Sequence, residues 1–131
     1  MALIEIVRDV HLSQDEVWSR LTDWQRHGDS VPLTSIRVTP TGFVARTGIG
    51  RLAFDDPMEI VSWEPPCFCR LEKRGRVVTG WAELRVIPLG GATRVVWRED
   101  LHVTGTPRSA DRLTRATSRK LFGRVVDDLL G

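Results

Sequence analysis

The sequence predicts an α+β fold in which a curved, seven-stranded antiparallel sheet wraps around a long C-terminal helix, with two short helices between the first and second strands. Three observations predict it. The chain opens with a strand and a helix that has a capping sequence, its middle is a run of period-two segments, and one long helical stretch ends it. The inner face of such a sheet needs a cover, and only the final helix is long enough to supply it.

The first strand and the first helix come from the opening residues. Residues 2–11 alternate apolar and polar side chains, as expected of a half-buried strand. Ser13 and Glu16 then form a capping box, in which each side chain binds a free amide of the first helical turn. Apolar residues follow at helical spacing, so we expect a helix over 13–22 and a short helical turn over 24–29.

Six more strands are expected from period-two segments that are separated by turn signals such as Pro-Thr-Gly and Gly-Ile-Gly. Because proline cannot donate a hydrogen bond within a ladder, Pro57 predicts a bulge or bend in the long fourth strand. The six segments are residues 35–39, 43–47, 52–64, 67–73, 77–88 and 93–104.

The final helix is expected over 109–130, with Ser109 as its N-cap. Its apolar residues do not form one stripe, because those before and after Gly123 point to different sides of the axis. Since glycine weakens a helix interior, the sequence predicts a kink there or a change of packing partner along the helix. The second half should pack on the sheet, and the first half should lie over an opening.

Length and composition indicate a single domain over residues 1–131, with 41% hydrophobic and 27% charged residues. No run approaches the ~18–20 apolar residues that cross a bilayer. The first segment contains acids and lacks the basic start of a signal peptide. Cys67 and Cys69 are splayed along one strand, which does not favour a disulfide. These features predict a cytoplasmic protein with reduced thiols.

The net charge of +2 is unevenly distributed. Residues 1–65 hold six arginines and ten acids, giving −4, and residues 66–131 hold thirteen basic residues and seven acids, giving +6. This balance is too mild to require nucleic acid. One stripe of the final helix is either a solvated face or a surface for anionic lipid, RNA or an acidic protein. The stripe consists of Arg108, Arg112, Arg115 and Arg119.

Glu99 is a candidate for proton transfer, because it lies between Trp97 and Leu101 on an apolar strand face. Burial there would raise its pKa and allow it to donate or accept a proton. Arg70 is the expected cationic partner, or a group that orients a ligand carbonyl. The alternative is a surface residue or a structural ion pair. Spacing identifies no second catalytic group.

Five tryptophans in a chain without tyrosine are a second candidate, because an indole offers a broad apolar wall and one N–H donor. Core filling is the alternative. Strand and helix parity predicts which side chains form the walls of a ligand site, although a one-residue shift in register would turn them outward. The predicted wall residues are Ile36, Val38, Phe54, Trp63, Leu71, Trp97, Leu121, Phe122 and Val125.

The histidines His11, His27 and His102 are scattered, and they form no metal-ligand spacing with the two cysteines. We expect ordinary packed or solvated histidines. The chain also lacks a phosphate-binding glycine loop and a Gly-x-Ser-x-Gly elbow. The sequence therefore predicts neither a metal nor a cofactor.

Several motifs, taken in order, resemble a known family. Residues 10–23 (VHLSQDEVWSRLTD) resemble the opening of the START-like (SRPBCC) superfamily, which contains polyketide cyclases/dehydrases and lipid-transport proteins. The resemblance covers nearly the whole chain and implies the helix-grip fold. One departure is the short turn at 39–42, where family members usually have a longer, glycine-rich connection. The other matching segments are Trp63–Pro66, Gly80–Glu83, Thr93–Trp97, 31–35, 43–48 and 54–58.

These observations predict that the protein binds a small hydrophobic or aromatic ligand, lipid- or polyketide-like, between the sheet and the last helix. Burial of apolar surface would drive binding. Because the family mixes enzymes and binders, a polyketide cyclase/dehydratase that uses the same cavity is an alternative. A protein- or RNA-interacting factor that uses the arginine stripe is another. A homodimer or a protein partner is also left open.

Overall fold

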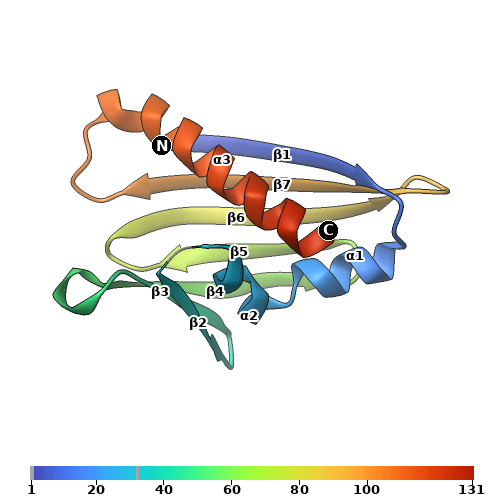
Figure 1. The fold of residues 1–131 in the computed structure, drawn as a ribbon, viewed down its shortest axis with the longest axis horizontal. Coiled ribbons are helices and arrows are strands. Elements are labelled where there is room, and N and C mark those ends of the chain that lie inside the picture. Colours follow the sequence, from blue (N-terminus) through green and yellow to red (C-terminus); the bar gives the residue numbers. More distant parts are fainter. Residues whose placement is uncertain (1, 32) are drawn as a thin grey trace.

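The computed structural model describes residues 2–31 and 33–131, and it has the predicted helix-grip architecture (Figure 1). The strands are β1 (Ala2–Val10), β2 (Thr34–Thr39), β3 (Gly42–Thr47), β4 (Phe54–Glu64), β5 (Phe68–Arg74), β6 (Val78–Pro88) and β7 (Thr93–Val103). The helices are α1 (Gln14–Leu21), α2 (Trp24–His27) and α3 (Asp111–Leu130), with short 3₁₀ turns at Gly28–Ser30, Gly50–Leu52 and Arg108–Ala110.

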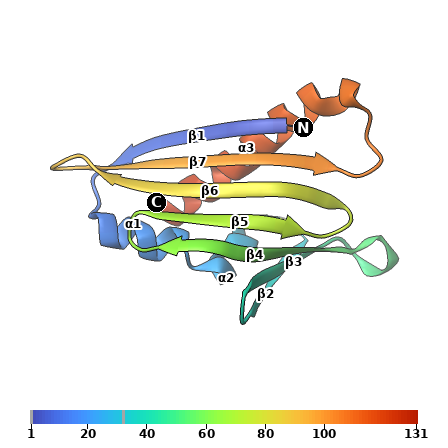
Figure 2. The same ribbon diagram turned by 180° about the vertical axis from the view of Figure 1, so that it is seen from behind.

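All seven strands form one antiparallel sheet in the order β1-β7-β6-β5-β4-β3-β2. α3 crosses one face of this sheet, and α1 and α2 lie against one end of the same face (Figure 1). Among the described residues, no helix lies on the opposite face (Figure 2). It carries cross-strand ion pairs instead, among them Arg94–Asp9 at 2.8 Å and Arg98–Glu5 at 3.4 Å. The apolar side chains therefore gather on the face that the helices cover.

The start of α1 is capped as the sequence predicts, but only on one side of the expected box. The Glu16 backbone N–H donates to Ser13 Oγ at 3.1 Å. The Glu16 carboxylate accepts a hydrogen bond from Arg20 at 2.8 Å on the surface of the helix, and not from the backbone N–H of Ser13 as the capping box predicts. The cap is worth ~1 kcal/mol. α1 then buries Val17 and Leu21 completely.

α3 begins at Asp111, and its N-cap lies one residue later than the predicted one. Ala110 is the N-cap and provides no side-chain hydrogen bond, so the prediction for Ser109 is wrong. A 3₁₀ turn before the helix accounts for the difference, because the Ala110 N–H already donates to the Pro107 carbonyl at 2.9 Å. The chain reaches α3 in helical geometry and needs no side-chain cap there.

The helix runs unbroken through Gly123 (Figure 1), so the predicted change along it is a change of packing. Leu113 in the first half is 71% exposed, whereas Val125 and Leu129 in the second half are buried. A Cβ atom at Gly123 would lie 3.4 Å from the guanidinium of Arg8. Gly123 therefore lies close to Arg8, which bridges β1 to Asp127 of α3 at 2.8 Å.

β4 contains an irregularity, but not at the position that proline predicts. Pro57 pairs in register with Val44, and the shift in register falls between Ile60 and Ser62. The residues on both sides of Pro57 also pair in register with β3, so the ladder has no bulge at the proline. The later shift places Trp63 opposite Cys69, on the face covered by the helices.

Candidate functional site

A cavity of about 260 Å³ lies between the covered face of the sheet and α3. Small residues at inward positions leave this space. Ala45 of β3 and Ala82 of β6 line it, and Gly80 of β6 is inward between Val78 and Ala82. Gly80 has φ of +128°, and a Cβ atom there would lie 1.8 Å from the Asp100 carbonyl oxygen. The local backbone therefore excludes a side chain from this part of the sheet.

Most of the predicted wall residues face the cavity. Residues of the sheet form one wall of the cavity and residues of α3 form the opposite wall, as strand and helix parity predicts. Whether these side chains contact a ligand stays a prediction. The predicted residues that line the cavity are Ile36, Phe54, Leu71, Trp97, Leu121, Phe122 and Val125.

Val38 and Trp63 do not line the cavity, so their placement has to be corrected. Val38 has inward parity, but it lies toward the end of the edge strand β2 and is 52% exposed. Trp63 lies beyond the cavity, where its ring is 5.2 Å from that of Trp18 in α1, and it is 46% exposed. Parity gives the face of a residue but not its position along the strand.

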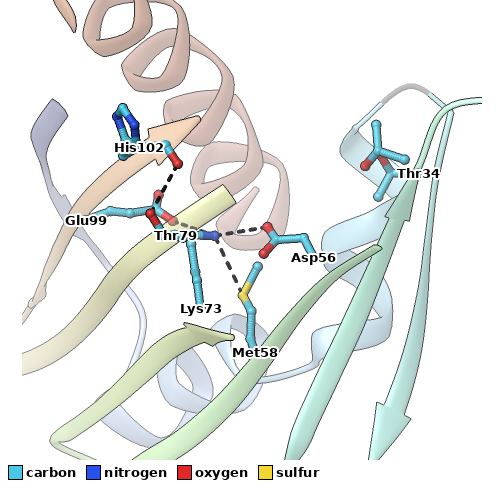
Figure 3. Close-up of polar contacts among 8 residues, drawn as sticks. Thr34, Asp56, Met58, Lys73, Thr79, Glu99 and His102 are labelled. Carbon is cyan, nitrogen blue, oxygen red and sulfur yellow. Dashed lines mark hydrogen bonds and ion pairs between the residues drawn. The ribbon is translucent and has the colours of Figure 1, made fainter. Parts of the chain in front are cut away.

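The cavity contains a buried cluster of charges made by Asp56, Lys73 and Glu99 (Figure 3). Lys73 Nζ lies 3.2 Å from Asp56 Oδ2 and 3.3 Å from Glu99 Oε1. The side chains of Lys73 and Glu99 are each 2% exposed, and that of Asp56 is 12% exposed. Lys73 Nζ also lies 3.9 Å from Met58 Sδ. These three charges, on β4, β5 and β7, form the buried charge cluster of the site.

The register of the sheet explains how these residues meet. Lys73 of β5 pairs with Met58 of β4 on one side and with Gly80 of β6 on the other. Glu99 pairs with Ala82 of β6. Because β6 presents only Gly80 and Ala82 between the two, the long lysine side chain can cross it and reach the glutamate.

Burial and mutual attraction act against each other on the pKa values of the cluster. Burial raises the pKa of Glu99 above its usual value, and the attraction of Lys73 offsets this only in part. Burial also raises the pKa of Asp56, again with partial compensation by Lys73. Burial would lower the pKa of Lys73, but Glu99 and then Asp56 outweigh it and raise that pKa. The lysine therefore stays charged, and the two carboxyls hold protons more readily than usual.

Several polar atoms of the site have no hydrogen-bond partner among the described residues. They are Asp56 Oδ1, Glu99 Oε2 and the indole nitrogen of Trp97. The Trp97 N–H acts on the Glu99 carboxyl and lowers its pKa, but it makes no hydrogen bond of good geometry. Buried polar groups are nearly always paired, so these atoms are available to a ligand or to water.

The cationic partner of Glu99 is Lys73 and not Arg70, which corrects the prediction from the sequence. Arg70 lies on the other face of β5, where it binds Glu83 at 2.7 Å and stacks over Trp81 at 4.6 Å. The signal that could have found Lys73 is strand parity, because Cys69, Leu71 and Lys73 alternate on one face. The same rule places Asp56 with Phe54 and Met58.

His27 also lines the cavity, beside Trp97 with ring centroids 6.0 Å apart. Its Nε2 lies 2.8 Å from the Leu21 carbonyl oxygen, which can only accept, so Nε2 carries the hydrogen. Burial lowers the pKa of His27 and outweighs the effect of that hydrogen bond. The ring is therefore neutral, and its Nδ1 carries no hydrogen. Sequence reasoning treated His27 as an ordinary packed residue and missed its place in the cavity wall.

The remaining sequence candidates lie away from the cavity. Arg112, Arg115 and Arg119 are exposed, and Arg115 interacts electrostatically with Asp111. The side chain of Arg108 lies outside the described part of the chain. Cys67 is exposed in the turn before β5 and Cys69 is buried, and both are free thiols.

Neither a metal-binding cluster nor a membrane span is found in the described part of the chain. Residues 2–31 and 33–131 contain no group of three or more His, Cys, Asp or Glu side chains arranged to hold a metal ion. Within the same ranges, no helix is long and apolar enough to cross a membrane.

A curved antiparallel sheet that holds one long helix over an internal cavity defines a helix-grip protein. The chain belongs to the family described as polyketide cyclase/dehydrase and lipid transport, which it matches over residues 1–131. Membership of this family supports a ligand-binding or cyclase role in general terms. No curated protein matches the sequence.

Solved structures show the same fold at low sequence identity. The protein XoxI from Bacillus cereus has a TM-score of 0.74 at 13% identity, with 99% of this chain and 94% of that chain covered. Mll3558 from Rhizobium loti has a TM-score of 0.72 at 14% identity, with coverage of 97% and 96%. The Zhui aromatase/cyclase from Streptomyces sp. R1128 has a TM-score of 0.64 at 17% identity, with coverage of 97% and 85%. At these identities the likeness concerns the fold alone.

Proposed function

We propose that the protein binds a small hydrophobic or aromatic ligand, lipid- or polyketide-like, in the cavity between the sheet and α3. The observation that carries this proposal is a cavity whose wall is mainly apolar and contains one buried charge cluster. Its volume of about 260 Å³ is just below the ~300–1,000 Å³ of typical ligand pockets. A compact molecule therefore fits better than a long-chain lipid.

Burial of apolar surface supplies the driving force, at ~25 cal/mol for each Å² removed from water. Leu71 and Trp97 on the sheet, with Phe122 on α3, form opposing apolar walls. The few polar groups would fix the orientation of the ligand, as they do in most small-molecule sites.

The test fills the cavity by the substitution Ala82→Leu, because Ala82 is 2% exposed and lines the cavity. Ala116→Leu, on the exposed side of α3, makes the same change outside the cavity and is the matched control. Equilibrium dialysis against naphthalene should show binding by the wild type and the control, and loss of binding by Ala82→Leu. Equal binding by all three folded proteins would contradict the proposal.

A second candidate is a polyketide cyclase/dehydratase in the same cavity, and the observation that favours it is the buried Glu99 carboxyl with its raised pKa. A general acid or base needs a pKa near the working pH, and burial moves Glu99 in that direction. The test compares the products that the wild type and Glu99→Gln form from a poly-β-ketone thioester, measured by mass spectrometry. Identical product patterns with and without protein would exclude this candidate.

A third candidate is a protein- or RNA-interacting factor, favoured by the exposed arginines of α3, Arg112, Arg115 and Arg119. Replacing Arg112 and Arg115 by glutamate should abolish this activity and leave binding of naphthalene unchanged. Retention of a co-purifying RNA or protein by that variant would exclude the stripe as its binding site. A cytoplasmic location and a homodimer remain predictions.

A further inference from the structure

The polar end of the cavity differs from its apolar walls in having an excess of acceptor atoms. Two carboxylates face one ammonium group, so the buried charge cluster has a formal charge of −1 when all three groups are ionised. His27 adds no positive charge, because its Nε2 hydrogen is committed to the Leu21 carbonyl and burial disfavours a second proton. Among the described residues that line the cavity, Lys73 is the only remaining cation.

Lys73 offers little to an incoming anion. An ammonium group has three N–H donors. Asp56 Oδ2 and Glu99 Oε1 lie within 3.3 Å of Nζ, and Met58 Sδ lies 3.9 Å from it. A ligand carboxylate would have to displace one of these contacts, and it would then lie beside two carboxyl groups in a site of low exposure. Like charges at such distances repel strongly when water is excluded.

The unpaired atoms of the site describe the complementary ligand. Asp56 Oδ1 and Glu99 Oε2 are buried acceptors that lack a hydrogen bond, and the Trp97 indole N–H acts on the Glu99 carboxyl without making a hydrogen bond of good geometry. A hydroxyl group can donate to a carboxylate oxygen and accept from the indole at the same time. A hydrocarbon would leave the two carboxyl oxygens without a donor, which is unfavourable wherever water does not reach them.

We infer that this cavity selects uncharged apolar or aromatic ligands that carry a hydroxyl group at one end, and that it excludes carboxylates of the same shape. The hydroxyl group binds at the carboxylate oxygens of Asp56 and Glu99, and the apolar body lies between the sheet and α3. This inference rests on the proposed ligand-binding function and adds the chemical class of the ligand. It separates phenols and alcohols from fatty or aromatic acids.

The test uses three probes that share one apolar body. They are naphthalene, a naphthylmethanol and a naphthoate, and the last two carry their substituent at the same ring position. Dissociation constants are measured by equilibrium dialysis at neutral pH. We expect the alcohol to bind at least about tenfold more tightly than the carboxylate, and also more tightly than naphthalene. Equal or tighter binding of the carboxylate overturns the inference while the proposed function stands. If none of the three binds, the proposed function fails, and the inference fails with it.

A charge-reversal variant checks that the cluster causes the preference. In the double variant Asp56→Asn/Glu99→Gln, Lys73 remains as an isolated cation, so the preference should invert toward the carboxylate. Arg70→Gln, on the opposite face of β5, is the control and should keep the wild-type preference. An unchanged preference in the folded double variant overturns the inference. If the double variant does not fold, the three-probe measurement on the wild type still decides the question.

Discussion

Removal of the lysine from the buried charge cluster should be among the most damaging single changes in this protein. In Lys73→Met, two carboxyls that share one cation lose it inside a site where Glu99 is 2% exposed and Asp56 is 12% exposed. Loss of one partner from a buried ion pair costs about 3–5 kcal/mol. Domains of this size are stable by only ~5–15 kcal/mol, so the variant should lose about a fifth or more of its free energy of unfolding.

The same reasoning predicts how this loss depends on pH. In the folded protein burial raises the pKa of Glu99 and Asp56, so the folded state binds protons more tightly than the unfolded state. The resulting stability is fully present below the unfolded values of ~4.3 and ~3.9, and it is lost as the pH rises through the folded values. Lys73 lowers the pKa of both carboxyls, so in its absence the pKa values of Glu99 and Asp56 in the folded state rise further. The destabilisation should therefore be larger at pH 8 than at pH 5 by at least about 1 kcal/mol.

Urea unfolding followed by tryptophan fluorescence at the two pH values measures both quantities. The double variant Lys73→Met/Glu99→Gln should recover part of the loss, because one unpaired carboxyl is removed. Arg94→Met is the control, since its ion pair with Asp9 lies on the helix-free face with both side chains 44–47% exposed and is worth about 1 kcal/mol or less. A loss below about 1 kcal/mol that does not change with pH would refute the argument, because it would mean that water solvates the cluster.

Three smaller predictions test other parts of the description. Ser13→Ala should lower the free energy of unfolding by ~1 kcal/mol, whereas Ser109→Ala should leave it unchanged, because only Ser13 caps a helix; equal effects in urea unfolding would contradict this. Gly80→Ala should cost more than ~1 kcal/mol, because its φ is +128° and the Asp100 carbonyl occupies the space of a Cβ; a wild-type thermal midpoint would exclude that constraint. Burial lowers the pKa of His27, so its contribution to stability is present above pH ~6.5 and is lost as the pH falls through the pKa of the folded state. The variant His27→Gln should not show this loss of stability at low pH. If its pH profile of unfolding equals that of the wild type, the ring is solvated.

Part of the site can be derived from sequence periodicity and part cannot. Phe54, Leu71 and Trp97 were assigned to the inner face from alternation alone, and each lines the cavity. Val38 and Trp63 follow the same alternation but do not line the cavity. Alternation depends only on the pleat of one strand. The extent of the cavity depends on where α3 and the neighbouring strands end, which no single strand encodes.

The choice of Arg70 as the partner of Glu99 has a similar origin. Both residues lie within predicted strands, and a cation near a buried acid is a sound expectation, but the two point to opposite faces. Lys73, three residues later, has the inward parity and a side chain long enough to pass over Gly80. The pairing could be recognised only when the register between β5, β6 and β7 was known.

The amino-acid sequence by itself determined the number and order of the strands and helices, the cap at Ser13 and the face of the sheet that is apolar, because these follow from propensities and periods among neighbours in the chain. Only the tertiary structure decided that Asp56, Lys73 and Glu99 form one cluster inside a cavity. The physical reason is that contacts across strands depend on register and on the small residues of intervening strands. These are properties of the assembled sheet, and they are not visible in any one segment of it.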